Sequence, residues 1–135
     1  MTGWLKRWFA KPPVFPPPTP SARTSSKPSH EIPPIEVKRL LDEGQKLILV
    51  DVRSPEEWEK ASLRNALKIP RDEIYARYGE IGNDPSAEIV VFCHHGIESE
   101  QAMHQLWGLG FQNAKTMPGG IDAWSVEVDP KTPRY

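Results

Sequence analysis

The chain has 135 residues, of which 38% are hydrophobic and 26% charged, which is enough for one core of moderate size but not for two ordinary domains. Its single cysteine, Cys93, has no partner for an intramolecular disulfide, so a reducing, cytoplasmic setting is expected. No apolar run approaches the roughly 20 residues of a transmembrane helix, so no membrane-spanning segment is expected.

The net charge of −1 hides an uneven distribution. Five basic residues and no acid precede Glu31, so the rest of the chain carries a charge of −6. The first 34 residues also hold nine of the 15 prolines, which remove backbone donors and favour extended chain. We therefore predict a basic, Pro-rich, disordered tail over residues 1–30 and one domain over residues 31–135.

The start of this tail, residues 1–12, sets Trp4, Trp8 and Phe9 among basic side chains. Such a segment favours a short amphipathic helix that makes a weak contact with a membrane surface or a partner. Its acid-free composition is also typical of organelle transit peptides. A third hypothesis is an unstructured tail whose aromatic side chains dock loosely. The sequence leaves these alternatives open, and no nucleic-acid partner is expected.

The first half of the domain alternates helix and strand patterns. Residues 34–43 have apolar positions at helical spacing, and Gly44 is placed to end that helix. Residues 47–50 form a continuous apolar run, which is typical of a strand buried on both faces. The sequence Ser-Pro-Glu-Glu from Ser54 predicts a capped helix that ends near residue 60.

The alternation continues to the end of the chain. A short strand is expected at 66–69, a helix at 72–78 and a strand at 89–92, and the apolar strand 89–92 delivers Cys93 to a polar loop. An amphipathic helix is expected to begin near Ser99.

A last strand at 114–117 precedes a Pro-Gly-Gly turn and a helical turn at 121–124. This order predicts an α/β fold with a mostly parallel sheet and helices on both faces. Ligands in such folds bind at the carboxyl ends of strands, which is where Cys93 falls.

The loop after the predicted strand 89–92 reads C-H-H-G-I-E-S from Cys93 to Ser99. Backbone N–H groups of a tight loop that enters a helix stabilise negative charge, and a cysteine reacts as its thiolate. Gly96 can adopt backbone angles that let successive N–H groups converge. The loop therefore predicts an anion cradle, which suits a persulfide.

These residues resemble the rhodanese family of sulfurtransferases. The similarity covers the LVDVRSPEEWE block at 49–59, the NALKIP block at 65–70, the VVFC strand and loop, and the block at 110–124. The resemblance implies a three-layer α/β/α domain whose five-stranded sheet has the order 1-5-4-2-3. It also implies that Cys93 is the catalytic cysteine, that a covalent persulfide replaces any cofactor, and that the substrate is held by His94, His95, Gly96, Ile97, Glu98 and Ser99.

The loop departs from the family pattern at one position. Sulfurtransferases of this family resemble C-x-x-x-x-R, and related phosphatases have one residue more, so the spacing here favours sulfur over phosphate. Glu98 stands where the arginine is expected. A carboxylate disfavours both a thiolate and an anionic donor, whereas an arginine favours them, although His94 and His95 offset part of this effect. Weak use of thiosulfate and exchange of persulfide with protein partners are therefore expected.

Two further residues, Asp51 and Arg53, are interpreted as supporting groups. Asp51 is expected to cap loop amides near the sheet end, and Arg53 to pair with an acid such as Glu57. A zinc site built from Cys93 and histidines that include His104 is a weaker alternative, because adjacent ligands on a tight turn rarely converge, so no metal is expected.

The end of the chain, residues 119–135, resembles the tail of rhodanese domains fused to adenylyltransferases of the molybdopterin and thiocarboxylate pathways. That resemblance implies thiosulfate or a cysteine desulfurase as donor and a protein or small molecule as acceptor. Trp124 and Tyr135 are expected to anchor this tail to a monomeric domain. Two hypotheses follow: a sulfurtransferase in which Cys93 carries sulfur, and an interaction module whose catalysis Glu98 has weakened.

Overall fold

The structure is a computed structural model that describes residues 30–135. Except for residue 30, the predicted tail and the proposed contact through residues 1–12 lie outside the described residues. Between residues 30 and 135, no helix is both long enough and apolar enough to cross a membrane.

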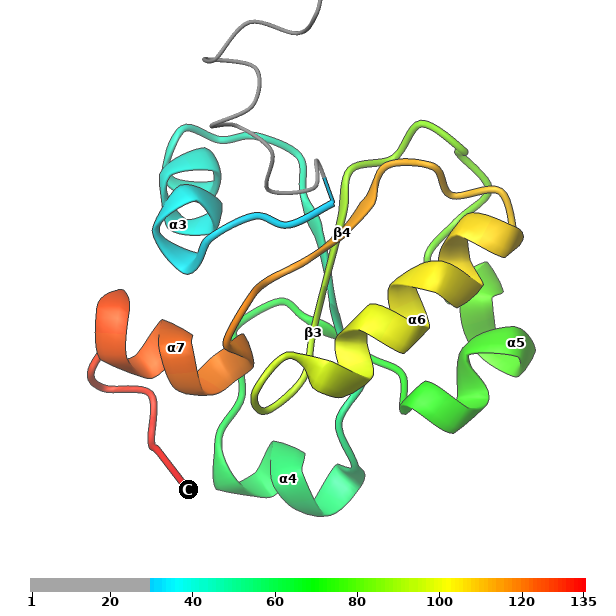
Figure 1. Cartoon of the computed structure of the whole chain (residues 1–135). Helices are drawn as coiled ribbons and strands as arrows, with labels where there is room; N and C mark the ends of the chain where they lie inside the picture. Colours follow the sequence, from blue (N-terminus) through cyan, green and yellow to red (C-terminus); the bar gives the residue numbers. More distant parts are fainter. Residues whose placement is uncertain (1–29) are drawn as a thin grey trace, which may run out of the picture.

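The centre of the domain is a parallel sheet of four strands, coloured from cyan to orange in Figure 1. In sheet order β2-β1-β3-β4, the strands are Leu67–Lys68, Ile48–Asp51, Ile89–Phe92 and Ala114–Thr116. The β3 strand pairs with both β1 and β4, so it lies inside the sheet and its four residues are all buried. The predicted strands at 47–50, 66–69, 89–92 and 114–117 are confirmed within two residues.

The expected fifth strand is reduced to one bridge among the described residues, so that prediction is wrong. Glu31 pairs in parallel with Thr116 at the β4 edge, which keeps the predicted strand order when Glu31 is counted as the first position. After Ile32 donates its N–H to the Thr116 carbonyl, two prolines follow, Pro33 and Pro34. Prolines have no N–H to extend a ladder, and Pro34 already begins a helix.

The helices confirm the predicted alternation and differ in their bounds. They are α3 (Pro34–Asp42), α4 (Pro55–Lys60), α5 (Ile74–Arg77), α6 (Ile97–Gly108) and α7 (Gly120–Glu127), with short 3-10 turns η1 (Arg71–Glu73) and η2 (Tyr78–Glu80). The helix expected at 72–78 is therefore broken into three short turns. The helical turn expected at 121–124 is a full helix, and α6 begins two residues before the predicted Ser99.

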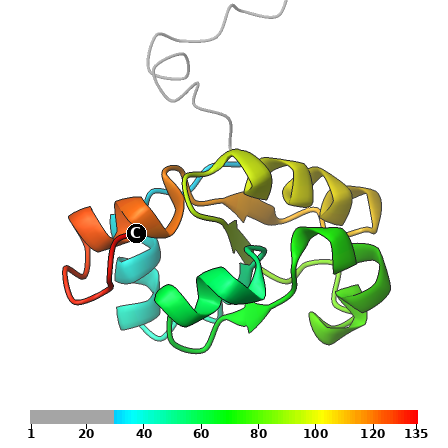
Figure 2. The same cartoon turned by 90° about the horizontal axis from the view of Figure 1, so that it is seen from below.

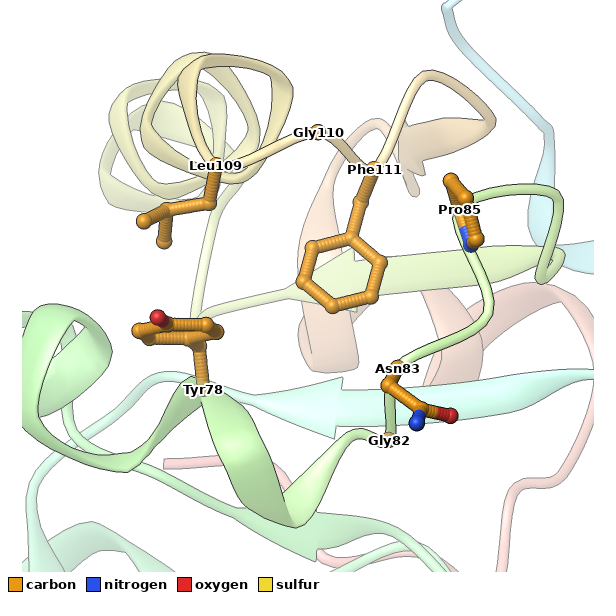
Figure 3. A pocket seen from close by; sticks show the side chains of 7 residues that line it. All are labelled: Tyr78, Gly82, Asn83, Pro85, Leu109, Gly110 and Phe111. Carbon is orange, nitrogen blue, oxygen red and sulfur yellow. The ribbon is translucent and has the colours of Figure 1, made fainter.

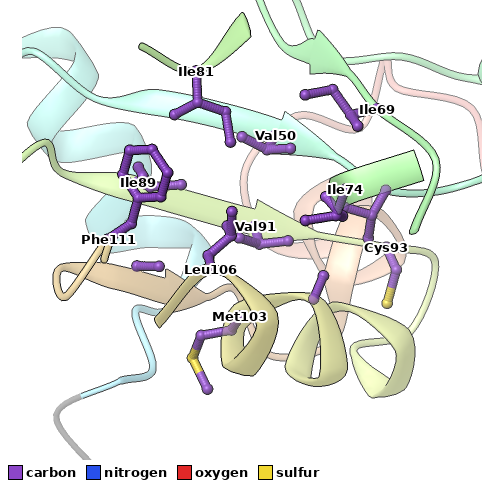
Figure 4. Close-up of a cluster of buried hydrophobic side chains, with 13 residues drawn as sticks. Val50, Ile69, Ile74, Ile81, Ile89, Val91, Cys93, Met103, Leu106 and Phe111 are labelled. Carbon is purple, nitrogen blue, oxygen red and sulfur yellow. The ribbon is translucent and has the colours of Figure 1, made fainter. Parts of the chain in front are cut away.

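The predicted three layers are confirmed by two separate cores, one on each face of the sheet. Figures 1 and 2 show α3 and α7 on one side and α5 and α6 on the other. Alternate residues of β3 serve the two cores: Val91 belongs to the core under α5 and α6, drawn in Figure 4, and Phe92 to the core under α3 and α7. Cys93 ends the first of these cores at the carboxyl edge of the sheet.

Candidate functional site

The sulfur of Cys93 lies at the start of α6 and is almost buried, with 2% of the residue exposed. It accepts the backbone N–H of Gly96 at 3.0 Å and that of Ser99 at 3.4 Å. The positive end of a twelve-residue helix dipole faces the same atom. Negative charge on this sulfur is therefore stabilised by converging donors, as the loop pattern predicts.

Gly96 explains why α6 begins at Ile97 rather than near Ser99. Its φ of +107° is a left-handed conformation that side chains disfavour, and it turns the chain into the helix within one residue. The Ser99 hydroxyl then donates to the Gly96 carbonyl at 3.2 Å. Ile97 and Glu98 consequently lie in the first helical turn, with their side chains exposed.

The loop is held from behind by the start of α7. The N–H of Ile121 donates to the Cys93 carbonyl at 2.9 Å, and the N–H of Asp122 to the His94 carbonyl at 3.2 Å. This approach requires glycine, because a Cβ on Gly120 would lie 2.3 Å from the Cys93 carbonyl oxygen. The Pro-Gly-Gly turn expected from the sequence thus fixes the loop that carries the sulfur.

A pocket of about 320 Å³ opens over Cys93. Besides the sulfur, it is lined by Glu57, His94, His95, Ile97 and Glu98. Five of the predicted loop residues, counted with Cys93, therefore share one opening. Two of the lining side chains are carboxylates, which disfavour an anionic small molecule at this position.

Aromatic stacking orders one side of this pocket. His94 lies between the rings of His95 and Tyr135, with ring centroids 3.8 Å and 3.9 Å apart and a nearly parallel contact of 7° to Tyr135. The Tyr135 hydroxyl donates to Glu57 Oε2 at 2.7 Å and accepts from Arg53 Nη1 at 2.7 Å. The expected anchor Tyr135 therefore contacts the site itself.

These contacts shift two acid–base equilibria. Burial raises the pKa of Tyr135 to about 12. The hydrogen bond from Arg53 favours the ionised phenol and acts in the opposite direction. Burial also opposes ionisation of Glu57, but hydrogen bonds from Tyr135 and Ser54 more than offset it, so the pKa of Glu57 is lowered. At neutral pH the tyrosine therefore keeps its proton and the glutamate accepts it in a hydrogen bond.

Asp51 and Arg53 form a fully buried ion pair beside this stack. Arg53 donates through Nε to Asp51 Oδ1 at 2.9 Å and through Nη2 to Oδ2 at 2.7 Å, and both side chains are 0% exposed. Arg53 also donates to the main-chain carbonyls of Ala61 and Glu57. Burial alone would lower the pKa of Arg53, yet its hydrogen bonds to Asp51 and Tyr135 and the charge of Asp51 raise it overall.

The structure corrects the expected partner of Arg53, which is the Asp51 carboxylate rather than that of Glu57. Asp51 still accepts one loop amide, the N–H of Arg53 at 3.1 Å. Neither residue lines the pocket over Cys93. Glu57 does line the pocket. The sequence predicted that it caps α4, and its carboxylate indeed accepts the Ser54 N–H and hydroxyl. No local pattern distinguishes a capping glutamate that also faces a site.

A metal centre is not assembled by the described part of the chain, where no three potential ligand side chains come together. His104, named in the zinc alternative, instead packs edge-on against Trp107, with ring centroids 4.8 Å apart.

A second hollow, of about 300 Å³, is lined by Tyr78 of η2, by the loop that follows η2 and by the residues directly after α6 (Figure 3). Its floor is formed by apolar side chains that include Tyr78, Leu109 and Phe111. None of the residues that line it belongs to the Cys93 loop.

Comparison with known proteins shows the family of this chain. A model of the rhodanese-like domain matches residues 33–127, which include the cradle and the sheet. The chain belongs to the rhodanese family. Among solved structures, a rhodanese-related protein from Thermoplasma volcanium superposes with a TM-score of 0.64 at 27% identity, covering 73% of this chain and 93% of that one.

The curated relatives of this rhodanese domain are larger proteins. It is 34% identical over 104 residues to the probable adenylyltransferase/sulfurtransferase MoeZ of Mycobacterium tuberculosis, covering 77% of this chain and 26% of MoeZ. It is 33% identical over 110 residues to the adenylyltransferase and sulfurtransferase UBA4 of Candida albicans, covering 77% and 25%. The chain thus spans about a quarter of the length of these relatives, and its homology is to their sulfurtransferase domains.

Proposed function

We propose that this rhodanese domain is a sulfurtransferase in which Cys93 carries sulfur as a persulfide. The observation that supports it is the pair of N–H groups from Gly96 and Ser99 that converge on a thiol at the bottom of a pocket. The thiolate attacks the outer sulfur of a persulfide donor R–S–S⁻, the sulfur–sulfur bond breaks, and R–S⁻ leaves. Cys93 then holds the terminal sulfur, and the cradle stabilises its negative charge.

The second half of the cycle returns the cysteine. An acceptor thiolate attacks the terminal sulfur, the bond to Sγ breaks, and Cys93 leaves as a thiolate in front of the same donors. No oxidant or cofactor is consumed, because sulfur is exchanged between equivalent oxidation states. We propose a cysteine desulfurase as donor, a protein or small-molecule thiol as acceptor, and a reducing cytoplasmic compartment.

The test is direct loading of the full chain. Incubation with a cysteine desulfurase and cysteine should add the mass of one sulfur atom to the intact protein, and a reducing thiol should remove it. Cys93→Ser is the control and should gain nothing. Absence of an adduct with desulfurase, with a low-molecular-weight persulfide and with thiosulfate would favour the alternative of a weakened interaction module.

Glu98 gives the proposal a second, quantitative test. Because its carboxylate lines the pocket, it repels the thiosulfate dianion, and Glu98→Arg replaces that repulsion by attraction. Coulomb's law at roughly 6 Å in water, halved by physiological salt, gives about a tenfold rise in kcat/KM for thiosulfate. Glu100→Arg changes the net charge equally from outside the pocket lining and is the matched control. Equal or lower thiosulfate turnover in Glu98→Arg would refute the argument that the Glu98 charge disfavours thiosulfate and so favours a protein persulfide as the donor.

A further inference from the structure

Tyr135 contacts two separate parts of the chain that line the opening over Cys93. Glu57 belongs to α4, and His94 belongs to the loop after β3. The tyrosine hydroxyl bonds to the first and its ring stacks on the second. Figure 1 shows the last residues, in red, running from α7 toward α4. One side chain thus joins two walls of the pocket that come from different elements.

The Tyr135 side chain is held by several contacts, although the residue is 36% exposed. Its oxygen accepts a hydrogen bond from Arg53, whose other donors are fixed on the buried Asp51 carboxylate and the Ala61 carbonyl. Lys60 Nζ lies 5.2 Å from the ring centroid, within range of a cation–π contact. The tyrosine therefore contacts a buried ion pair on one side and two residues that line the pocket on the other.

We propose that Tyr135 is a specificity-determining positioning residue that sets the width of the opening over Cys93. Because Tyr135 joins Glu57 on α4 to His94 on the loop, small molecules that react with the Cys93 thiol should enter the opening more readily than bulky ones. Its biological meaning rests on the proposed function, since the molecules selected would be the sulfur donor and acceptor. A narrow opening favours an acceptor that presents its thiol on an extended, narrow segment over one embedded in a broad surface.

The width can be measured without any sulfur transfer. Cys93 is the only cysteine, so alkylation of the full chain reports on this site alone. We compare the second-order rates of iodoacetamide and of a maleimide with a bulky aromatic substituent. Tyr135→Phe keeps the stack on His94 but removes the hydrogen bond to Glu57 Oε2, and the ratio of bulky to small rates should rise about fivefold, the factor that corresponds to one ordinary hydrogen bond. Tyr135→Ala removes both contacts and should raise the ratio further.

A matched control separates this role from a general loosening of the fold. Tyr75→Ala removes a tyrosine that is 62% exposed on α5 and should leave the ratio unchanged. A wild-type ratio in Tyr135→Phe, or an equal rise in Tyr75→Ala, would overturn the proposal.

The outcome remains decisive if Tyr135→Ala fails to fold, because Tyr135→Phe then carries the test. It is also independent of the sulfur chemistry. A wild-type protein that never loads sulfur refutes the proposed function but leaves the alkylation ratios intact, whereas unchanged ratios refute the role of Tyr135 in a protein that still loads sulfur.

Discussion

Removing Arg53 should destabilise the domain far more than removing an exposed arginine. In Arg53→Met the Asp51 carboxylate, 0% exposed, loses the two side-chain donors that compensate for its burial. Leaving one charge of a buried pair without its partner costs about 3–5 kcal/mol. With a urea m-value of about 1 kcal/mol/M for a domain of this size, the unfolding midpoint should fall by about 3–5 M.

The assay is urea unfolding at pH 7 followed by circular dichroism, with Arg39→Met as the matched control. Arg39 pairs with Glu36 and Glu43 on the exposed face of α3, and its loss should leave the midpoint nearly unchanged. The double variant Asp51→Asn with Arg53→Met should be more stable than Arg53→Met alone, because the unpaired carboxylate is gone. Equal midpoint shifts for Arg53→Met and Arg39→Met would refute the reasoning.

Two further predictions concern a contact of α7 and an ionisation. Gly120→Ala places a Cβ 2.3 Å from the Cys93 carbonyl oxygen at a φ of +60°, so overpacking and strain should cost about 3 kcal/mol and slow loading of Cys93, whereas Gly79→Ala, with open space around it, should do neither. Because the folded pKa of Tyr135, about 12, lies above the unfolded value of about 10, its contribution to stability is complete below pH 10 and is lost as the pH rises toward 12. Urea midpoints between pH 9 and 11.5 should therefore fall more steeply in the wild type than in Tyr135→Phe, and parallel curves would contradict this assignment.

The parts of the fold that depend on neighbours in sequence were predictable. The run Ile89–Phe92 is apolar at every position, which is typical of a strand buried on both faces, and it is the inner strand β3. Gly96 was expected to adopt backbone angles that let successive N–H groups converge, and its positive φ at the start of α6 fits this expectation. Local chemistry of this kind also located the sulfur and its cradle.

The features that were missed depend on contacts between distant segments. Tyr135 bonds to Glu57 across 78 positions of sequence, and no periodicity encodes such a pair. Arg53 pairs with the Asp51 carboxylate rather than with that of Glu57. Both side chains are buried, and a buried guanidinium is stabilised by a carboxylate that accepts from two of its donors. This burial cannot be read from the sequence. The lost fifth strand reflects competition between a ladder beyond Ile32 and a helix that begins at Pro34.

The position of Tyr135 also has a practical consequence for tethering. A segment fused after Tyr135 would start beside the opening over Cys93. An acceptor protein with a free thiol, fused there by a short flexible linker, would therefore be present at an effective concentration in the millimolar range. A fusion entering at His30 starts beside Trp107, which lies ten residues beyond Ile97 on α6, or about 15 Å along the helix. The two points of attachment would therefore supply the same acceptor to the same cysteine at different rates.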